Sequence, residues 1–255
     1  MGKLQDRVVL VTGASRGFGA TIAVGMAQEG AHVAVHYNTF EAGAEQTAQA
    51  VRDLGREAIT VQADLVNWNS IKQMVSQVYD RFSRIDVLVN NVGDVARHQM
   101  SWRDITEESI DHVLAVDIKG TMLMMHEVGS RMVEQQHGVI VNIGSHVVIN
   151  GSARAPQYAA GKYGVIGLTK SYAHALAPYV RVNTLGPGFI ETETTMNRED
   201  WKNGRREKVL NDTPLKALPK PEDLIGSVVF LASDDSKFMT GTFTVIDGGY
   251  GMVGA

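Results

Sequence analysis

The stretch Val8-Val9-Leu10-Val11-Thr12-Gly13-Ala14-Ser15-Arg16-Gly17-Phe18-Gly19 decides the fold of this 255-residue chain. Its apolar start predicts a buried strand, and a helical pattern follows directly from Gly17. Glycines at such a junction let backbone N–H groups approach a pyrophosphate at the N-terminus of the helix. The spacing is TGxxxGxG, which differs from GxGxxG, and no Gly-Lys-Ser/Thr of a P-loop follows. The stretch predicts a dinucleotide-binding turn, with a tight turn that holds no ligand as the alternative.

Short apolar runs alternate with longer amphipathic segments over the rest of the chain. The runs predict strands at Val8–Thr12, His32–Tyr37, Ala58–Ala63, Val87–Asn90, Val139–Ile143, Val180–Thr184 and Phe243–Ile246. Helical patterns lie between them at 17–29, 41–54, 70–83, 107–134, 156–177 and 221–232, with Ser70 and Thr106 as expected N-caps and Pro221 at a first helical position. We therefore expect a single α/β domain over residues 1–255. Its core would be a Rossmann-type, doubly wound parallel sheet of about seven strands with helices on both faces.

Composition excludes several classes of function. Hydrophobic residues make up 44% of the chain, charged residues 20%, and the net charge is -4, so nucleic acid and anionic membrane are not expected partners. The chain has no cysteine, no apolar run of membrane-spanning length and no leader-like start, which fits a cytoplasmic protein. His32 and His36 are four residues apart on a predicted strand, about 13 Å from each other. With no HExxH motif, we expect no metal site.

The end of the second predicted strand bears on the choice of dinucleotide. A carboxylate there would bind the ribose hydroxyls of NAD, but the chain continues Tyr37-Asn38-Thr39 and has no acid before Glu41. Arg16, inside the glycine turn, could face a 2′-phosphate. These residues favour NADP(H), while NAD(H) stays possible and Arg16 could instead be a solvated surface arginine.

A second pattern predicts a catalytic site. Tyr158 and Lys162 are spaced i, i+4 and share one face of a predicted helix. An ammonium near a phenol favours the phenolate, which makes Tyr158 a usable general acid or base. Ser145 follows the fifth predicted strand, on the edge of the sheet where ligands bind, and its hydroxyl could hold a substrate oxygen beside Tyr158.

Together these residues resemble the short-chain dehydrogenase/reductase family along essentially the whole chain. The matching motifs are the turn at 12–19, Asp64, Asn90-Asn91-Val92-Gly93, Ser145, Tyr158-x-x-x-Lys162, Pro187-Gly188 with Thr192, and Asp247-Gly248-Gly249.

The resemblance implies an oxidoreductase that transfers hydride between a nicotinamide dinucleotide and a small carbonyl or alcohol substrate. Tyr158 would be the general acid or base, Ser145 would steady the substrate oxygen, and Lys162 would hold the nicotinamide ribose. His146 could also contact substrate. The residues expected to bind the cofactor are Gly13, Ser15, Arg16, Gly17, Phe18, Gly19, Tyr37, Asn38, Thr39, Asp64, Leu65, Asn91, Gly93, Tyr158, Lys162, Pro187, Gly188, Ile190 and Thr192. Family members are commonly homotetramers, so we expect one here.

One position departs from the family pattern. The family carries an asparagine, within a segment like Val-Asn-x-x-Gly, that supports a water linking the active-site lysine to solvent. This chain has Val116-Asp117-Ile118-Lys119-Gly120. Asp117 is therefore counted with the catalytic residues. It could serve through its backbone carbonyl, pair with Lys162, or be a tolerated isostere.

The substrate is the least determined part. Positions expected to face it are Asp94–His98, His146–Ser152 and 189–215, including Val95, Arg97, His98 and Trp201. The poorly periodic stretch 189–218 is expected to be a long loop that acts as a lid, with a mobile surface insertion as the alternative.

Three further functions fit the same motifs less well. A 3-oxoacyl-thioester reductase is weakened because Glu134-Gln135-Gln136-His137 and Pro178-Tyr179 lack the basic residues of that group, although Arg131 is near. A non-catalytic NADP(H)-binding sensor or scaffold would have Asp117 as its one indication. A nucleotide-sugar epimerase or dehydratase would need a larger C-terminal region, and little chain remains after Pro187.

Overall fold

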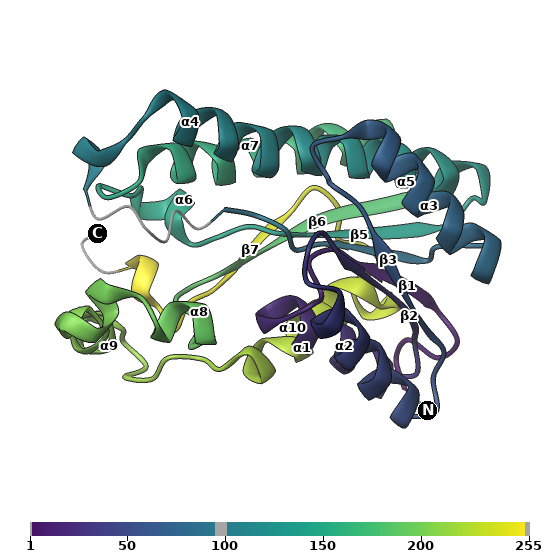
Figure 1. Cartoon of the computed structure of the whole chain (residues 1–255), viewed down its shortest axis with the longest axis horizontal. Helices are drawn as coiled ribbons and strands as arrows, with labels where there is room; N and C mark the ends of the chain where they lie inside the picture. The colour runs from purple at the N-terminus through teal and green to yellow at the C-terminus, as the bar shows by residue number, and fades with distance from the viewer. Residues whose placement is uncertain (1, 95–100, 253–255) are drawn as a thin grey trace.

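The computed structural model describes residues 2–94 and 101–252. Seven parallel strands form one sheet in the order β3-β2-β1-β4-β5-β6-β7 (Figure 1). The strands are β1 Val8–Val11, β2 His32–Tyr37, β3 Ala58–Gln62, β4 Val87–Asn90, β5 Gly138–Ile143, β6 Val180–Pro187 and β7 Phe243–Ile246. The order reverses between β1 and β4, so the loops after these strands diverge and leave a crevice at the carboxyl edge.

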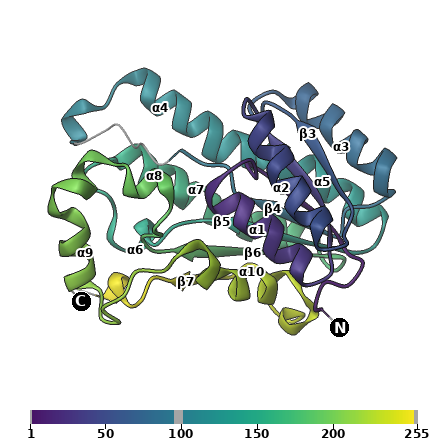
Figure 2. The same cartoon turned by 60° about the horizontal axis from the view of Figure 1, so that its bottom comes forward.

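Helices cover both faces of the sheet (Figures 1 and 2). On one face lie α1 Gly17–Gln28, α2 Glu41–Asp53 and α10 Ile225–Ala232; on the other lie α3 Trp68–Phe82, α4 Glu107–Val113, α5 Thr121–Glu134 and α7 Pro156–Ala175. Each face of the sheet packs against its helices in a hydrophobic core, called here the α1 core and the α3 core. Alternate strand residues enter different cores: Val9 and Val11 pack in the α1 core, whereas Val8 and Leu10 pack in the α3 core. This two-sided burial explains why the strands read as continuous apolar runs.

The expected doubly wound parallel sheet is confirmed, and most elements begin and end within two residues of their predicted ends. Ser70 is not an N-cap: Asn67 caps α3, and its side chain accepts a hydrogen bond from the Ser70 N–H. Thr106 does cap α4. The predicted helix 107–134 consists of α4, a π-helical segment Leu114–Gly120, and α5.

The stretch 189–218 is not the continuous loop that its weak periodicity predicted. It contains the short helix α8 Glu193–Met196, a kinked π-type turn at Trp201–Arg205, and the helix α9 Arg206–Asp212. Trp201 and Val209 anchor it because their side chains are buried. Short helices of this kind are set by docking rather than by intrinsic propensity, so the sequence pattern does not reveal them.

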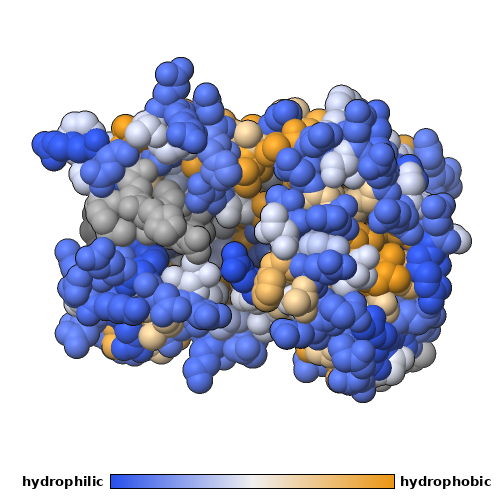
Figure 3. All heavy atoms as spheres, in the orientation of Figure 1, coloured by the Kyte–Doolittle hydropathy of each residue, from blue (hydrophilic) through white to orange (hydrophobic). Residues whose placement is uncertain are grey.

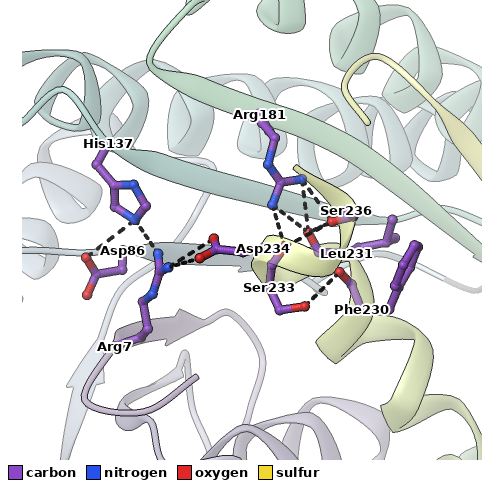
Figure 4. A network of polar contacts seen from close by, with 9 residues as sticks. All are labelled: Arg7, Asp86, His137, Arg181, Phe230, Leu231, Ser233, Asp234 and Ser236. Carbon is purple, nitrogen blue, oxygen red and sulfur yellow. Dashed lines mark hydrogen bonds and ion pairs between the residues drawn. The ribbon is translucent and has the colours of Figure 1, made fainter. Parts of the chain in front are cut away.

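A polar network joins the amino ends of the strands (Figure 4). Arg7 contacts His137 and forms an ion pair with Asp234 at 3.1 Å. Arg181 donates to the carbonyls of Leu231 and Ser233 at the end of α10. The edge of the sheet opposite the crevice is thus tied together by charged side chains.

Within the described residues, no helix is long and apolar enough to cross a membrane. The same part of the chain holds no group of three or more histidine, aspartate or glutamate residues that could bind a metal ion. The expectations of no metal and of a cytoplasmic location stay predictions.

Candidate active site

A cleft of about 1330 Å³ opens at the carboxyl ends of the strands. Loops that follow β1 to β6 contribute to its walls. The predicted site residues that line it are Gly13, Ser15, Arg16, Gly17, Phe18, Gly19, Asn38, Thr39, Asp64, Leu65, Asn91, Gly93, Ser145, His146, Tyr158, Lys162, Pro187, Gly188, Ile190 and Thr192. The fold therefore brings together residues that are up to about 180 positions apart in the chain.

The glycine turn is held by a histidine that the sequence analysis did not assign to the site. Gly13 has a φ of +63°, and its N–H donates to Nδ1 of His36 at 2.9 Å. The other ring nitrogen, Nε2, lies 3.0 Å from the Ala63 carbonyl and must donate to it. Burial lowers the pKa of His36 to about 4, so the imidazole is neutral. His36 thus joins the ends of β1, β2 and β3.

Asn91 ties the same turn to β4. Its side-chain amide donates to the carbonyls of Thr12 and Gly13, at 3.0 and 3.3 Å. Its backbone N–H donates to the Thr12 hydroxyl at 2.9 Å. No side chain caps the first turn of α1, whose residues are all described. Its N–H groups can therefore bind an anion, and the turn fits a pyrophosphate.

The cofactor end of the cleft contains Arg16. The Arg16 guanidinium lies 6.0 Å from the centre of the Phe40 ring, beside Asn38 and Thr39. The described lining includes no acid from the end of β2. Tyr37 does not line the cleft as predicted; its side chain packs in the α1 core because it points to the opposite side of β2 from His36.

Tyr158 and Lys162 lie on α7, and the Lys162 ammonium is 5.9 Å from the centre of the Tyr158 ring. The ammonium is buried and donates to the Ile143 carbonyl at the end of β5. Ser145 follows this strand, is buried, and accepts a hydrogen bond from the Val147 N–H at 3.2 Å. A Cβ at Gly93 would overlap the Lys162 ammonium, so a larger residue there would displace this group.

Asp117 does not line the cleft but lies behind Lys162. Its Oδ2 is 3.5 Å from the Lys162 Nζ, and its Oδ1 accepts a hydrogen bond from the Asp94 N–H at 2.8 Å. Its carboxyl is fully buried, and burial raises its pKa. Burial lowers the pKa of Lys162, but the charge and hydrogen bond of Asp117 together with the charges of Tyr158 and Asp94 raise it overall. The pairing with Lys162, one of the options left open by the sequence, is therefore present.

An aromatic wall made of His146, Phe189 and Tyr250 borders the cleft beyond Ser145. The His146 and Phe189 rings are 4.9 Å apart, and Tyr250 meets both edge-on at 5.4 Å. Asp247 shapes the turn that carries Tyr250, since its carboxylate accepts from the N–H groups of Gly249 and Gly251. Burial lowers the pKa of His146, which favours its uncharged form in this wall.

The expected substrate positions are only partly found in the cleft. Val95, Arg97 and His98 lie outside the described residues. Trp201 does not face the cleft, because its ring is buried 5.4 Å from that of Phe189. Three arginines that the sequence analysis did not single out line the cleft instead: Arg154, Arg198 and Arg205.

Proteins of similar sequence point to one family. A family model described as enoyl-(acyl carrier protein) reductase matches residues 13–251. The chain is 36% identical to a 3-oxoacyl-[acyl-carrier-protein] reductase of Staphylococcus epidermidis, over 96% of this chain and 99% of that protein. Identity to the enzyme of the same name from Thermotoga maritima is 37%, over 97% and 98% of the two chains.

Solved structures point to the same family. A levodione reductase superposes with a TM-score of 0.91 and 32% identity, over 98% of this chain and 99% of the other. A short-chain type dehydrogenase/reductase from Mycobacterium marinum superposes with a TM-score of 0.87 and 29% identity, over 97% of this chain and 96% of the other.

The chain belongs to the short-chain dehydrogenase/reductase family. It is an oxidoreductase that acts on carbonyl or alcohol groups, and members of this family bind nicotinamide cofactors. A non-catalytic sensor or scaffold and a nucleotide-sugar epimerase or dehydratase are therefore not retained.

Proposed function

We propose that this short-chain dehydrogenase/reductase interconverts a small carbonyl compound and its alcohol with NADP(H), using Tyr158 as the general acid or base. The observation that carries the proposal is that Ser145, Tyr158 and Lys162 line the same cleft as the glycine turn. One end of this cleft offers uncapped helix N–H groups to a pyrophosphate, and the other offers hydroxyl groups to a substrate oxygen.

The residues divide the chemistry between them. A bound nicotinamide supplies or accepts the hydride. In the reductive direction the Tyr158 hydroxyl donates its proton to the carbonyl oxygen, and Ser145 donates a hydrogen bond to the same oxygen. The Lys162 ammonium stabilises the phenolate left behind and can bind the ribose hydroxyls. Asp117 is a positioning residue, because it reaches the reacting groups only through Lys162.

The preference for NADP(H) rests on charge. Arg16 lies at the cleft beside Asn38 and Thr39, where a 2′-phosphate would extend from the adenosine ribose. A guanidinium binds a phosphate with charge-assisted hydrogen bonds, whereas the diol of NAD would need an acid at this place. Asp64 and Leu65 line the neighbouring wall, and we assign the adenine to it.

We also propose that residues 189–218 form a lid over the substrate and that the protein is a homotetramer. The buried Trp201 anchors the segment near its middle, and the hydrogen bond from Leu215 N–H to the Gly248 carbonyl anchors it near its end, so its motion would take place about these two points. Exposed apolar side chains on α5 and α7, such as Met122 and Tyr163, support a helix-mediated contact between copies.

A 3-oxoacyl-thioester reductase is a second candidate, because the Staphylococcus epidermidis and Thermotoga maritima relatives carry that name. The basic residue that the sequence analysis considered for contact with a carrier protein is Arg131. Its guanidinium is engaged with the Ser76 hydroxyl and lies 4.7 Å from the centre of the Tyr79 ring. This engagement favours a small free substrate over one bound to a carrier protein.

The test follows NADPH or NADH absorbance with a panel of ketones, oxo acids, sugars and acyl thioesters. We expect turnover with NADPH that falls at least about a thousandfold in Tyr158→Phe, which keeps the ring and loses the proton donor. Unchanged turnover in this variant would contradict the role of Tyr158. A kcat/KM for an acyl-carrier-protein thioester far above that for every free ketone would select the second candidate.

A further inference from the structure

The imidazole of His146 lies at the substrate end of the cleft, directly after Ser145 and before the short helix α6 (Val147–Asn150). The residue is only 9% exposed. One of its ring nitrogens, Nδ1, lies 3.2 Å from the carbonyl oxygen of Pro187 at the end of β6. Since a carbonyl oxygen only accepts hydrogen bonds, Nδ1 carries a hydrogen and donates it to Pro187.

The second ring nitrogen of His146 has no hydrogen-bond partner among the described residues, unlike either ring nitrogen of His36. Burial lowers the pKa of His146 and favours the neutral ring. In a neutral ring whose hydrogen is on Nδ1, the other nitrogen, Nε2, has a lone pair and can only accept a hydrogen bond. His146 therefore has one unused acceptor.

This acceptor is within reach of a ligand. Nε2 lies on the part of the ring away from the main chain, and His146 is one of the residues that line the cleft. It is also not one of the unpartnered side-chain atoms that the described chain seals from solvent, among which is Nε1 of Trp201. A molecule in the cleft can therefore donate a hydrogen bond to Nε2.

The orientation of the His146 ring is fixed before any substrate binds. Its plane is inclined by 52° to that of Phe189 at 4.9 Å, and Tyr250 meets it edge-on at 5.4 Å. Its backbone N–H donates to the same Pro187 carbonyl at 2.9 Å. A group held on its faces, its edge and its main chain loses little freedom when a ligand binds.

Ser145 has the opposite hydrogen-bonding role. Its Oγ accepts from the Val147 N–H at 3.2 Å, and its own hydrogen has no acceptor among the described residues. The Ser145 hydroxyl is therefore free to donate to a carbonyl oxygen. Two consecutive residues, whose Cα atoms are about 3.8 Å apart, thus offer a donor and an acceptor to the cleft. This pair is complementary to a carbonyl group with a hydroxyl group close to it.

The acceptor on His146 discriminates between substrates because of its surroundings. Phe189 and Tyr250 are half-buried beside it. Figure 3 shows that hydrophilic residues dominate the surface over α8 and α9, beside the central hollow. A methyl group placed against Nε2 would remove water from the lone pair and give no hydrogen bond in return, whereas a hydroxyl group would give one.

We propose that the substrate is a hydroxy ketone, or the corresponding diol in the reverse direction, and that His146 accepts a hydrogen bond from its hydroxyl group through Nε2. The inference rests on the proposed function and narrows its substrate class. Ser145 and Tyr158 donate to the carbonyl oxygen, and His146 accepts from the neighbouring hydroxyl. These contacts fix which face of the carbonyl carbon meets the hydride.

The test compares pairs of ketones in which a methyl group replaces the hydroxyl group. The pairs are hydroxyacetone against butanone, 4-hydroxy-2-butanone against 2-pentanone, and 2-hydroxycyclohexanone against 2-methylcyclohexanone. With NADPH, we expect kcat/KM for at least one hydroxy ketone to exceed that for its methyl partner by about tenfold or more. The pair in which this occurs gives the spacing between the two oxygens.

Variants then connect this preference to His146. His146→Phe keeps an aromatic ring in the wall but has no acceptor, and the Pro187 carbonyl keeps its backbone donor. We expect the ratio of kcat/KM between hydroxy ketone and methyl partner to fall by about tenfold in this variant. His146→Gln retains an acceptor oxygen and should keep more of the ratio. His174→Phe, at an exposed position of α7 outside the cleft, is the matched control and should leave the ratio unchanged.

Nitrogen-15 NMR of the histidine rings tests the same contact without turnover. The sample is wild-type protein loaded with NADP⁺, which cannot reduce a ketone, and the His146 signals are assigned by their absence in His146→Gln. We expect Nε2 to carry no hydrogen at neutral pH. Its resonance should shift on addition of a hydroxy ketone but not of the methyl partner. A hydrogen on Nε2 in the wild type would overturn the inference.

The outcomes separate this inference from the proposed function. A preference for the hydroxy ketone that persists in His146→Phe would overturn the inference, and so would the absence of a preference in all three pairs, while turnover of the ketones would still support a reductase. If no ketone turns over, the NMR titration decides. A shift of Nε2 with a hydroxy ketone alone would keep the site although the reductase proposal had failed, and no shift would overturn both.

Discussion

At the scale of a single residue, Asp117 contributes to the pKa of Lys162. Burial by itself lowers the pKa of Lys162, and nearby acidic groups, first among them Asp117 at 3.5 Å, raise it overall. In Asp117→Asn the carboxylate is gone while the burial stays, so the ammonium should be lost at lower pH. We expect the alkaline limb of kcat/KM to move to lower pH, with activity at pH 7 within about tenfold of wild type.

The measurement is a pH–rate profile between pH 6 and 11. Asp111→Asn, an exposed carboxylate on α4, is the control and should leave the profile in place. An alkaline limb that does not move in Asp117→Asn would show that Asp117 does not set the charge of Lys162. Asparagine is the residue of the family pattern, so this variant is expected to fold.

We expect His36 to make the stability of the protein depend on acid pH. The pKa of its buried ring is lowered to about 4 from 6.5, so the unfolded chain binds the proton first as the pH falls. The stability that its neutral form contributes is therefore complete above pH 6.5 and is lost as the pH falls toward 4. The shift corresponds to about 3 kcal/mol over this window.

Urea unfolding at pH 7, 5.5 and 4.5 tests this. His36→Gln keeps a donor for the Ala63 carbonyl but does not titrate, so its free energy of unfolding should fall less steeply with acid than that of wild type. His174→Gln, at an exposed position of α7, should follow wild type. Parallel curves for wild type and His36→Gln would refute the role of His36.

At the scale of an element, the proposed preference for NADP(H) rests on the turn between β1 and α1. Arg16 is the residue before α1, and the Phe40 ring lies beside its guanidinium. Arg16→Gln would remove a charge-assisted contact worth about 1.5–3 kcal/mol. We expect kcat/KM for NADPH to fall by about 10- to 100-fold, with NADH changed by less than about threefold.

Steady-state kinetics with both cofactors checks this, beside Lys208→Gln, which removes an exposed positive charge on α9. A proportional loss with NADPH and NADH would mean that Arg16 contacts no 2′-phosphate.

The π-helical segment 114–120 is a second element that shapes the site. It contains Asp117 and places this side chain behind Lys162.

At the scale of the whole molecule, the carboxyl ends and the amino ends of the parallel strands differ in function. The carboxyl edge holds the cleft, and the amino edge holds the network of Arg7 and Arg181 (Figure 4). The Arg181 guanidinium donates to the carbonyls of Leu231, Ser233 and Met239 and to the Ser236 hydroxyl. Stability and chemistry should therefore respond separately to substitution.

Arg181→Gln is expected to lower the free energy of unfolding by about 2–4 kcal/mol, because several carbonyls lose a charged donor. Below the unfolding transition its kcat/KM should remain within about twofold of wild type. Urea midpoints and kinetics on the same preparation test this, with Lys208→Gln as control. A large loss of kcat/KM in a stable variant would show that the amino edge is coupled to the cleft.

Much of the site could be predicted because its residues lie in local motifs. Strands and glycine turns are set by nearest neighbours in sequence, and parallel strands place their carboxyl ends on one edge. Ser145, Tyr158, Lys162 and most of the expected cofactor-binding residues accordingly line one cleft, although their individual roles stay predictions. Tyr37 does not line the cleft, and the reason is also local: alternate residues of β2 face opposite sides of the sheet, and Tyr37 faces the core beside α1.

The sequence by itself determined the doubly wound sheet, the position of the cleft and the catalytic motif, because each depends on periodicity or on short spacing. The tertiary structure alone decided that Asp117 pairs with Lys162 and that His36 supports the glycine turn. These contacts join residues 45 and 23 positions apart. They depend on side-chain packing between elements, and no local pattern encodes that packing.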